Sequence, residues 1–306
     1  RREDVNEAGS PTAYLDPEVI SRLSRLDLIA RLVVEGFITG LHRSPYHGFS
    51  VEFSEHRPYM SGDPLRDLDW KAYGKTGRLY IKQYEEETNL KAYILLDISG
   101  SMDFQSGGPL SKFQYASSLA AALAHLLLRQ RDAVGLTLFH DRIDTYIPPR
   151  SMQSHLQVLL KAINQTTPAA DTRMAPAFQD LAERISRRGL VVVISDLLDD
   201  PEEVLKGLKY FRHRGHEVIV FQILDPRERD LDFSNQTRFY DLEDPDQTLT
   251  TQPWHIRSEY RAMMDDLIRT YRNGCADARI DHALIDTTTP FDVALSCYLV
   301  RRKRMG

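Results

Sequence analysis

The sequence of 306 residues has little cysteine and no long hydrophobic run. Its two cysteines, Cys275 and Cys297, form neither a disulfide framework nor a zinc-binding spacing, and they fit a reducing compartment best. The longest apolar stretch, residues 116–128, contains two serines and a histidine, and it is too short and too polar to span a bilayer. No signal peptide is evident. We therefore expect a cytoplasmic protein without a transmembrane segment.

The chain also lacks a strong excess of charge and the common nucleotide-binding motifs. Its formal net charge of −5 argues against dominant nonspecific binding of nucleic acid. It contains no P-loop, no Gly-x-Gly-x-x-Gly after a strand and no helical zinc motif. The apolar and charged fractions, 42% and 27%, are ordinary for a globular protein of this length, which can bury a substantial core.

The most informative stretch that is present runs from Tyr93 to Met102. Four apolar residues, 93–96, have the pattern of a strand buried on both faces, and Asp97 follows them directly. Ser99 and Ser101 come two and four residues after Asp97, with a glycine between them that lets the backbone turn. The sequence therefore places one acid and two hydroxyls at the carboxyl end of a parallel strand, where open α/β sheets bind their ligands.

A carboxylate and two hydroxyls are hard oxygen ligands, which suit Mg²⁺ or Mn²⁺ better than zinc or copper. Asp-x-Ser-x-Ser after a hydrophobic strand is also the signature of the metal-ion-dependent adhesion site. In this feature the sequence resembles the von Willebrand factor A fold. The resemblance implies a Rossmann-like, mainly parallel sheet with helices on both faces.

The pattern after residue 89 agrees with that α/β fold class, because strands and helices alternate regularly. Predicted strands cover residues 93–96, 134–139, 190–195, 218–224 and 283–285, with 145–147 as an antiparallel neighbour and 238–242 as an edge strand. Predicted helices cover residues 112–131, 151–164, 176–188, 200–215, 258–275 and 291–302. Gly189 is expected to cap the third of these helices.

The N-terminal part, residues 1–38, is predicted to hold a polar tail and one helix. Asp16-Pro17-Glu18 is a helix start, with an N-cap acid and proline at the first helical position. An apolar stripe at helical spacing runs from Val19 to Val33, and Gly36 and Gly40 are expected to mark the exit.

Residues 39–89 form a β-rich segment of a different composition, before an α/β domain at 90–306. It contains Gly-x-His-x-Ser-x-x-x-Gly and then Phe-x-Glu-x-Arg-x-Tyr-x-x-Gly-Asp-x-x-Arg-x-x-Asp-Trp, which spans Phe53 to Trp70. This string resembles the bacterial family called domain of unknown function 58 (DUF58), whose members carry it directly before a von Willebrand factor A domain. Its charged residues, Arg57, Asp63, Arg66 and Asp69, could form an ion-pair network or a recognition surface for a carboxylate or phosphate; we favour the network.

The resemblance implies two further metal-binding loops. Thr172 lies in the loop where this fold places its threonine ligand, and Asp196 ends the strand at 190–195. The predicted metal site is therefore Asp97, Ser99, Ser101, Thr172 and Asp196, with Mg²⁺ or Mn²⁺ as the ion. The resemblance further implies a non-catalytic protein-binding module, in which an acidic side chain of a partner completes the coordination of the ion.

Members of this family commonly accompany MoxR-type AAA+ ATPases. The resemblance thus implies that the chain works with such an ATPase in the assembly or maturation of protein complexes.

The alternative is a metal-dependent phosphatase or nuclease that uses Asp97 and Asp196. Asp97 at a strand end invites comparison with haloacid-dehalogenase-type phosphatases, with Asp199 and Asp200 as a later acid pair. The structural interpretation of these two acids is a helix start, with Asp200 before Pro201 and Glu202. Those enzymes need a second acid two residues after the nucleophile, and Ser99 stands there. Ser99 is not a nucleophile elbow either, since the residue two before it is not glycine.

Overall fold

The structure is a computed structural model, and it describes residues 14–43, 56–58, 73–74, 77, 80–82, 90–168, 174–185, 187–240, 242 and 248–305. The chain divides into two compact units, one made of residues 1–40 with 90–306 and the other of residues 41–89. The first unit contains a large sheet and most of the helices. It also contains all the predicted metal-site residues.

The described residues form a central sheet of six strands, in which only one edge strand is antiparallel to its neighbour. The order across the sheet is β10 (Asp281–Asp286), β7 (Glu217–Leu224), β6 (Leu190–Ser195), β3 (Lys91–Asp97), β4 (Ala133–Phe139) and β5 (Ile143–Arg150). The antiparallel pair is β4 and β5, as the short turn between them predicted. The first of these strands along the chain, β3, lies in the middle of the sheet. The next two, β4 and β5, extend the sheet on one side, and β6, β7 and β10 then extend it on the other, which is the doubly wound arrangement.

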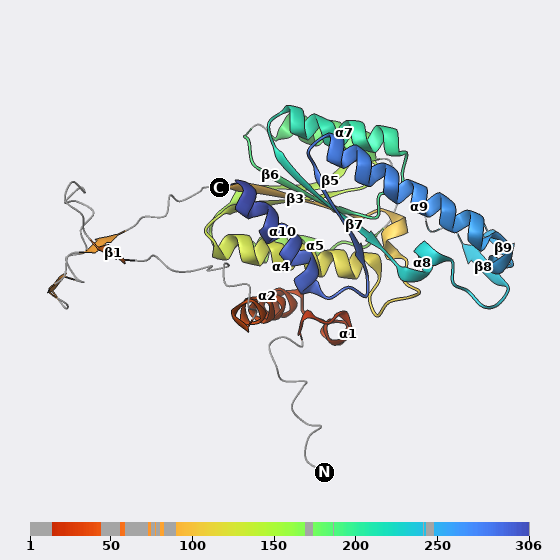
Figure 1. Ribbon diagram of the computed structural model, residues 1–306, viewed down its shortest axis with the longest axis horizontal. Coiled ribbons are helices and arrows are strands. Elements are labelled where there is room, and N and C mark those ends of the chain that lie inside the picture. Colours follow the sequence, from red (N-terminus) through yellow and green to blue (C-terminus); the bar gives the residue numbers. More distant parts are fainter. Residues whose placement is uncertain are drawn as a thin grey trace, which may run out of the picture. The chain divides into compact units, whose positions relative to one another are not determined.

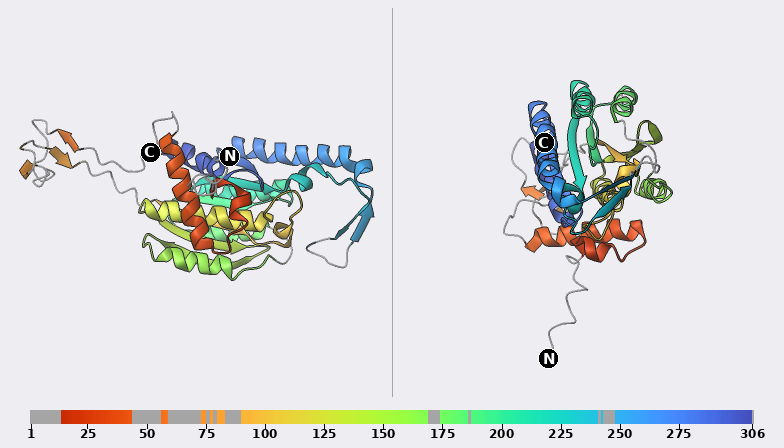
Figure 2. Two further views of the ribbon diagram at one scale, coloured as in Figure 1. Left: turned by 90° about the horizontal axis from the view of Figure 1, so that it is seen from below. Right: turned by 90° about the vertical axis from the view of Figure 1, so that its right-hand side faces the viewer.

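Helices cover both faces of the sheet (Figure 1), so the predicted α/β fold class is confirmed. On one face lie α4 (Lys112–Arg129), α5 (His155–Asn164) and α10 (Phe291–Met305). On the other lie α6 (Met174–Arg184), α7 (Pro201–His213) and α9 (Pro253–Asp277). The second view of Figure 2 shows the sheet edge-on between these layers.

The middle strands are apolar on both faces because helices cover both of them. Tyr93 and Leu95 of β3 belong to the core beneath α6 and α7, with Phe178 and Phe211 from those helices. The intervening residues Ala92, Ile94 and Leu96 are also buried. In β3 and β6 the buried polar side chains, Asp97 and Ser195, stand at the last strand positions, so the fold brings them to one edge of the sheet.

The N-terminal helix prediction was partly wrong. Asp16 does cap a helix, since its carboxylate accepts from the Glu18 amide, but this helix, α1, is a single turn at Pro17–Ile20. A second helix, α2 (Leu26–Arg43), follows after a break and continues through Gly36. Serine competes for backbone hydrogen bonds, which explains the break near Ser21 and Ser24. Buried neighbours on α2 outweigh the low helix propensity of Gly36.

Gly189 does not cap a helix, because α6 ends at Arg184. It lies instead at the start of β6, where an added Cβ atom would overlap the carbonyl oxygen of Lys91 on β3. The glycine is therefore needed for the close approach of two neighbouring strands. The glycine that does end a helix is Gly215, after α7, whose φ is +82°.

We expect Gly189→Ala to lower the free energy of unfolding by at least about 2 kcal/mol, because backbone must move to admit the methyl group. Gly74→Ala is the matched control, since nothing lies within 4 Å of its Cβ position, and it should stay within about 1 kcal/mol of wild type. Urea unfolding of both variants measures the difference. Equal stability of the two variants would contradict the close approach.

The described residues also form two short sheets that are separate from the central one. The residues expected to form an edge strand at 238–242 are instead β8 (Thr237–Tyr240), which pairs with β9 (Thr248–Thr251) in a separate hairpin. In the second unit, β1 (His56–Pro58) pairs antiparallel with β2 (Tyr80–Lys82). The predicted ion-pair network falls largely outside the described residues, which leave out Asp63, Arg66 and Asp69.

Candidate functional site

The site is built where two neighbouring parallel strands end. Leu96 of β3 pairs with Ile194 of β6, so Asp97 and Asp196 follow at the same edge of the sheet. After Asp97 the chain enters a short 3₁₀ turn, η3 (Gly100–Asp103), with Ser99 as its N-cap. The turn folds Ser101 back toward the end of β6.

A continuous chain of oxygen contacts joins three of the predicted ligands. The hydroxyls of Ser99 and Ser101 lie 3.1 Å apart, and the Ser101 hydroxyl donates to Oδ2 of Asp196 at 2.8 Å. Ser99 and Asp196 are fully buried, and Ser101 is partly buried. Side chains 95 residues apart in the sequence thus meet at one point.

Asp97 lies behind this chain and is held from two sides. Its Oδ1 accepts from the Ser99 backbone amide at 2.8 Å, and its Oδ2 accepts from the Ser195 hydroxyl at 2.6 Å. Burial and then the negative charge of Asp196 raise the pKa of Asp97 to about 7, although the Ser195 and Ser99 contacts oppose the rise. A cation bound beside this carboxyl group would favour its ionised form.

The spacing of these oxygens fits a divalent cation. Two ligands that share an edge of an octahedron around Mg²⁺ lie about 3 Å apart, since each Mg–O bond is about 2.1 Å. The Ser99–Ser101 and Ser101–Asp196 oxygen separations, 3.1 and 2.8 Å, match that edge. The donor set is all oxygen, as Mg²⁺ and Mn²⁺ prefer. Among the described residues, no group of three or more His, Cys, Asp or Glu is arranged to hold a metal ion.

Thr172, the fifth predicted ligand, lies outside the described residues. The helix that follows it is tied to the site nonetheless. The Met174 amide, at the start of α6, donates to the Asp199 carboxylate at 2.8 Å, and Asp199 also accepts from the Asp200 amide. Asp200 caps α7 through the Glu202 amide, as predicted. The two acids therefore hold helix starts, which is the structural role expected from the sequence.

The sequence patterns did not predict a role at the site for Lys112, the first residue of α4. This lysine is fully buried, and its ammonium donates to Oδ2 of Asp196 at 2.7 Å and to both oxygens of Glu228 at 2.6 and 2.8 Å. Burial lowers the pKa of Lys112, but the charges of Asp196 and Glu228 outweigh burial and raise it. Burial raises the pKa of Glu228, which Lys112 opposes. A lysine directly after the capping serine, at the head of an apolar helix, was the available signal.

Glu228 belongs to α8 (Pro226–Asp230), a short helix after β7 that the sequence reading also missed. The fully buried Asp225 caps this helix by accepting from the Arg227 amide at 2.9 Å. The same carboxylate accepts from the amides of Ser106 and Gly107, in the loop between η3 and α4. Asp225 therefore joins the loop that precedes Lys112 to the helix that carries Glu228.

A second series of hydrogen bonds, from β7 and β10, supports the end of β6. Gln222 of β7 donates to the backbone carbonyl of Asp196 at 3.1 Å, and its side-chain oxygen lies 3.0 Å from Nε2 of His282 on β10. Burial and then the positive charge of Arg272 lower the pKa of His282 to about 4. A neutral His282 donates to Gln222, which fixes the amide that holds the end of β6.

We expect His282 to make the fold sensitive to acid. The unfolded chain takes up a proton on this histidine near pH 6.5 and the folded chain only near pH 4, so stability falls as the pH falls between these values. The loss should reach about 2 kcal/mol at pH 5. Urea unfolding at pH 7.5 and 5 should show a smaller loss in His282→Gln than in wild type. The exposed His213, changed to glutamine as a control, should leave the loss unchanged.

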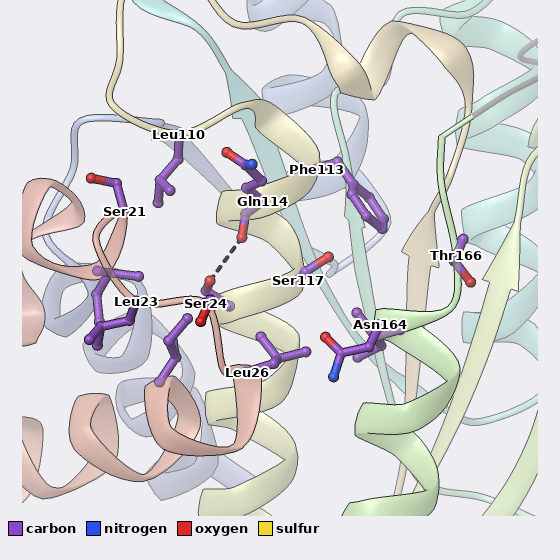
Figure 3. A pocket seen from close by; sticks show the side chains of 14 residues that line it. Ser21, Leu23, Ser24, Leu26, Leu110, Phe113, Gln114, Ser117, Asn164 and Thr166 are labelled. Atoms are coloured by element: carbon purple, nitrogen blue, oxygen red, sulfur yellow. Dashed lines mark hydrogen bonds between the residues drawn. The ribbon is translucent and has the colours of Figure 1, made fainter.

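A pocket of about 270 Å³ lies elsewhere on the first unit, between the N-terminal helices, α4 and the end of α5 (Figure 3). Hydroxyl, amide and apolar side chains line it, including Ser24, Leu26, Phe113, Gln114 and Asn164. Its lining includes no charged side chain, so it offers no group for acid–base chemistry.

Within the described part of the chain, no helix combines the length and apolar character that crossing a membrane requires.

The model of the family described as protein of unknown function DUF58 matches residues 55–267, more than half of the chain. The uncharacterized protein Rv1480 of Mycobacterium tuberculosis is 29% identical over 220 residues, which cover 71% of this chain and 68% of that protein.

Two solved structures resemble the fold at low sequence identity. BatB from Bacteroides thetaiotaomicron is 16% identical with a TM-score of 0.47, over 70% of this chain and 99% of that one. The VWA domain of SpRpn10 is 11% identical with a TM-score of 0.41, over 68% of this chain and 93% of that one.

Proposed function

The chain belongs to the DUF58 family, and from this premise we propose that it is a protein-binding module that depends on a divalent cation. Asp97, Ser99, Ser101 and Asp196 would hold Mg²⁺ or Mn²⁺, with Thr172 as a further ligand. An acidic side chain of a partner protein would complete the coordination.

The observation that carries the proposal is the meeting of Ser99, Ser101 and Asp196 in one chain of oxygen contacts at the end of β3 and β6. Asp97 lies directly behind them, and the two groups described as donating to its carboxylate, the Ser99 amide and the Ser195 hydroxyl, are both uncharged. Such an edge of an open α/β sheet is where ligands bind.

Each residue has a separate task in this mechanism. A bound cation would supply positive charge to which a carboxylate of the partner could attach. Ser99 and Ser101 would offer neutral oxygens, which leave more of the ion's charge for the partner than carboxylates do. Asp97 and Asp196 would add the negative charge that retains the ion, and the hydrogen bonds from Ser195 and Gln222 keep both strand ends in place.

We further propose a MoxR-type AAA+ ATPase as the partner or co-worker of the chain. This rests on the family resemblance, since proteins of this kind commonly accompany such ATPases. The assembly or maturation of protein complexes would then be the shared task.

The phosphatase alternative needs Asp97 as a nucleophile that reaches a substrate. Asp97 is fully buried, and both of its oxygens accept hydrogen bonds. This geometry favours a binding role over nucleophilic attack.

The experiment that tests the proposal is retention of a purified MoxR-type ATPase from the same organism on the immobilised chain. Because the ATPase itself uses Mg²⁺, the decisive comparison is between variants in the same Mg²⁺ buffer. Wild type should retain the ATPase, and Asp97→Asn should not. Asp103→Asn, an exposed acid on η3, is the matched control and should behave as wild type.

Equal retention by wild type and Asp97→Asn would contradict the proposed mechanism. Hydrolysis of a phosphate ester by wild type, lost in Asp97→Asn, would instead support the enzymatic alternative.

A further inference from the structure

Lys112 places a permanent positive charge inside the candidate cation site. Its ammonium is fully buried and has two carboxylate partners, Asp196 at 2.7 Å and Glu228 at 2.6 Å. The ring of Phe104 lies 5.9 Å from the ammonium and shields it further. A buried ammonium is stable only with such partners, so this ion-pair cluster is a built part of the site.

The oxygen that Lys112 contacts is the same one that the Ser101 hydroxyl contacts, Oδ2 of Asp196. Ser101 is a proposed ligand of the divalent cation, so the ammonium reaches into the ligand set itself. A divalent cation at this oxygen and the ammonium of Lys112 would therefore compete for one carboxylate. Two positive charges that share one carboxylate in a buried site repel each other strongly.

Glu228 is a second carboxylate partner of the Lys112 ammonium. It binds the ammonium through both oxygens, whereas Asp196 uses only one. If Asp196 turns to a divalent cation, Lys112 keeps two hydrogen bonds and its charge remains neutralised by Glu228. The capping box of Ser111 and Gln114 fixes the start of α4, and the lysine can therefore shift by side-chain rotation alone.

We propose that Lys112 is a tethered competitor for the divalent cation, and that Glu228 sets the strength of this competition by drawing the ammonium away from Asp196. The inference rests on the proposed function, because it assigns the residues that tune the same cation site. It implies that the ion is held weakly until a partner's carboxylate adds negative charge. Binding of the cation and of the acidic partner would thus support each other.

Substitutions at Lys112 and at Glu228 should change the affinity for Mn²⁺ in opposite directions. A cluster that only stabilised the fold would not produce this difference. Lys112→Met removes the competitor, and the dissociation constant for Mn²⁺ should fall at least tenfold. Glu228→Gln leaves the ammonium with Asp196 as its charged partner, and the dissociation constant should rise at least tenfold. Titration of Mn²⁺ followed by electron paramagnetic resonance of the free ion measures both constants on the full chain.

Lys112→Met leaves Glu228 buried beside an apolar side chain and could fail to fold, which circular dichroism reveals. The double variant Lys112→Met/Glu228→Gln removes both charges and avoids this problem. Compared with Glu228→Gln alone, it should bind Mn²⁺ at least tenfold more tightly. Lys206→Met, at an exposed lysine of α7, makes the same charge change away from the cluster and should leave the constant unchanged.

The possible failures are distinguishable. The inference alone is overturned if wild type binds Mn²⁺ and Lys112→Met binds it no more tightly than wild type does. It is likewise overturned if the double variant binds Mn²⁺ no more tightly than Glu228→Gln does. A tighter constant in Glu228→Gln would also overturn it. If neither wild type nor any folded Lys112 variant binds Mn²⁺, the proposed cation site fails, and this inference fails with it.

Discussion

Replacement of Ser99 and Ser101 together by alanine is expected to abolish any stabilisation of the fold by Mg²⁺ or Mn²⁺. A ligand that binds only the native state stabilises it by about 2.7 kcal/mol at 100 times its dissociation constant. Wild type should therefore melt several degrees higher in Mg²⁺ than in EDTA. The double variant loses two neutral oxygens of the ligand set, and its melting temperature should be the same in both buffers.

The matched control for this melt is Ser118→Ala. Ser118 is a buried serine whose hydroxyl donates to the Gln114 carbonyl inside α4, so the change removes a similar group away from the ligand set. It should keep the full response to the cation. If the double variant keeps the same response as wild type, the two hydroxyls are not ligands.

The second large effect is expected at Asp225. Asp225→Ala removes a fully buried carboxylate that accepts from the backbone amides of Ser106, Gly107 and Arg227. A hydrogen bond to a charged group contributes about 1.5 to 3 kcal/mol, and three amides would lose their acceptor. We therefore expect the free energy of unfolding to fall by about 4.5 kcal/mol or more, measured by urea unfolding.

The same change should also open the loop between η3 and α4, because Asp225 is what joins that loop to α8. Limited proteolysis should cut Asp225→Ala within residues 104–110 faster than wild type. Asp232→Ala, which removes an exposed acid paired with Arg257, is the control and should cost less than about 1 kcal/mol. A similar small cost at Asp225 would contradict the role of its carboxylate.

Sequence patterns predicted the fold class well because the middle of the sheet obeys local rules. The strand β6 was predicted with its observed bounds, since five consecutive apolar residues after a glycine, followed by Ser195 and an aspartate, have few other structures. The N-cap acids Asp16 and Asp200 were also predicted, because capping depends on neighbouring residues only. Helix ends and the hairpin of β8 and β9 were less predictable, since they depend on contacts between distant segments.

The residues of the candidate site were likewise predictable only in part. The sequence placed Asp97, Ser99, Ser101 and Asp196 at one edge, and the structure brings them together. It did not predict the contact between Lys112 and Glu228, because these residues lie 116 positions apart and Lys112 is marked only by its place at the head of an apolar helix. Only the fold, which brings Glu228 of α8 to the first residue of α4, shows that Lys112 is fully buried and Glu228 largely so.

The most direct test of the account is a count of the Mn²⁺ ions that each chain binds, by electron paramagnetic resonance of the free ion. Wild type should bind one ion per chain at this site, and Ser99→Ala/Ser101→Ala should bind none over the same range of concentration. Equal binding by the two proteins would contradict a cation site at the ends of β3 and β6.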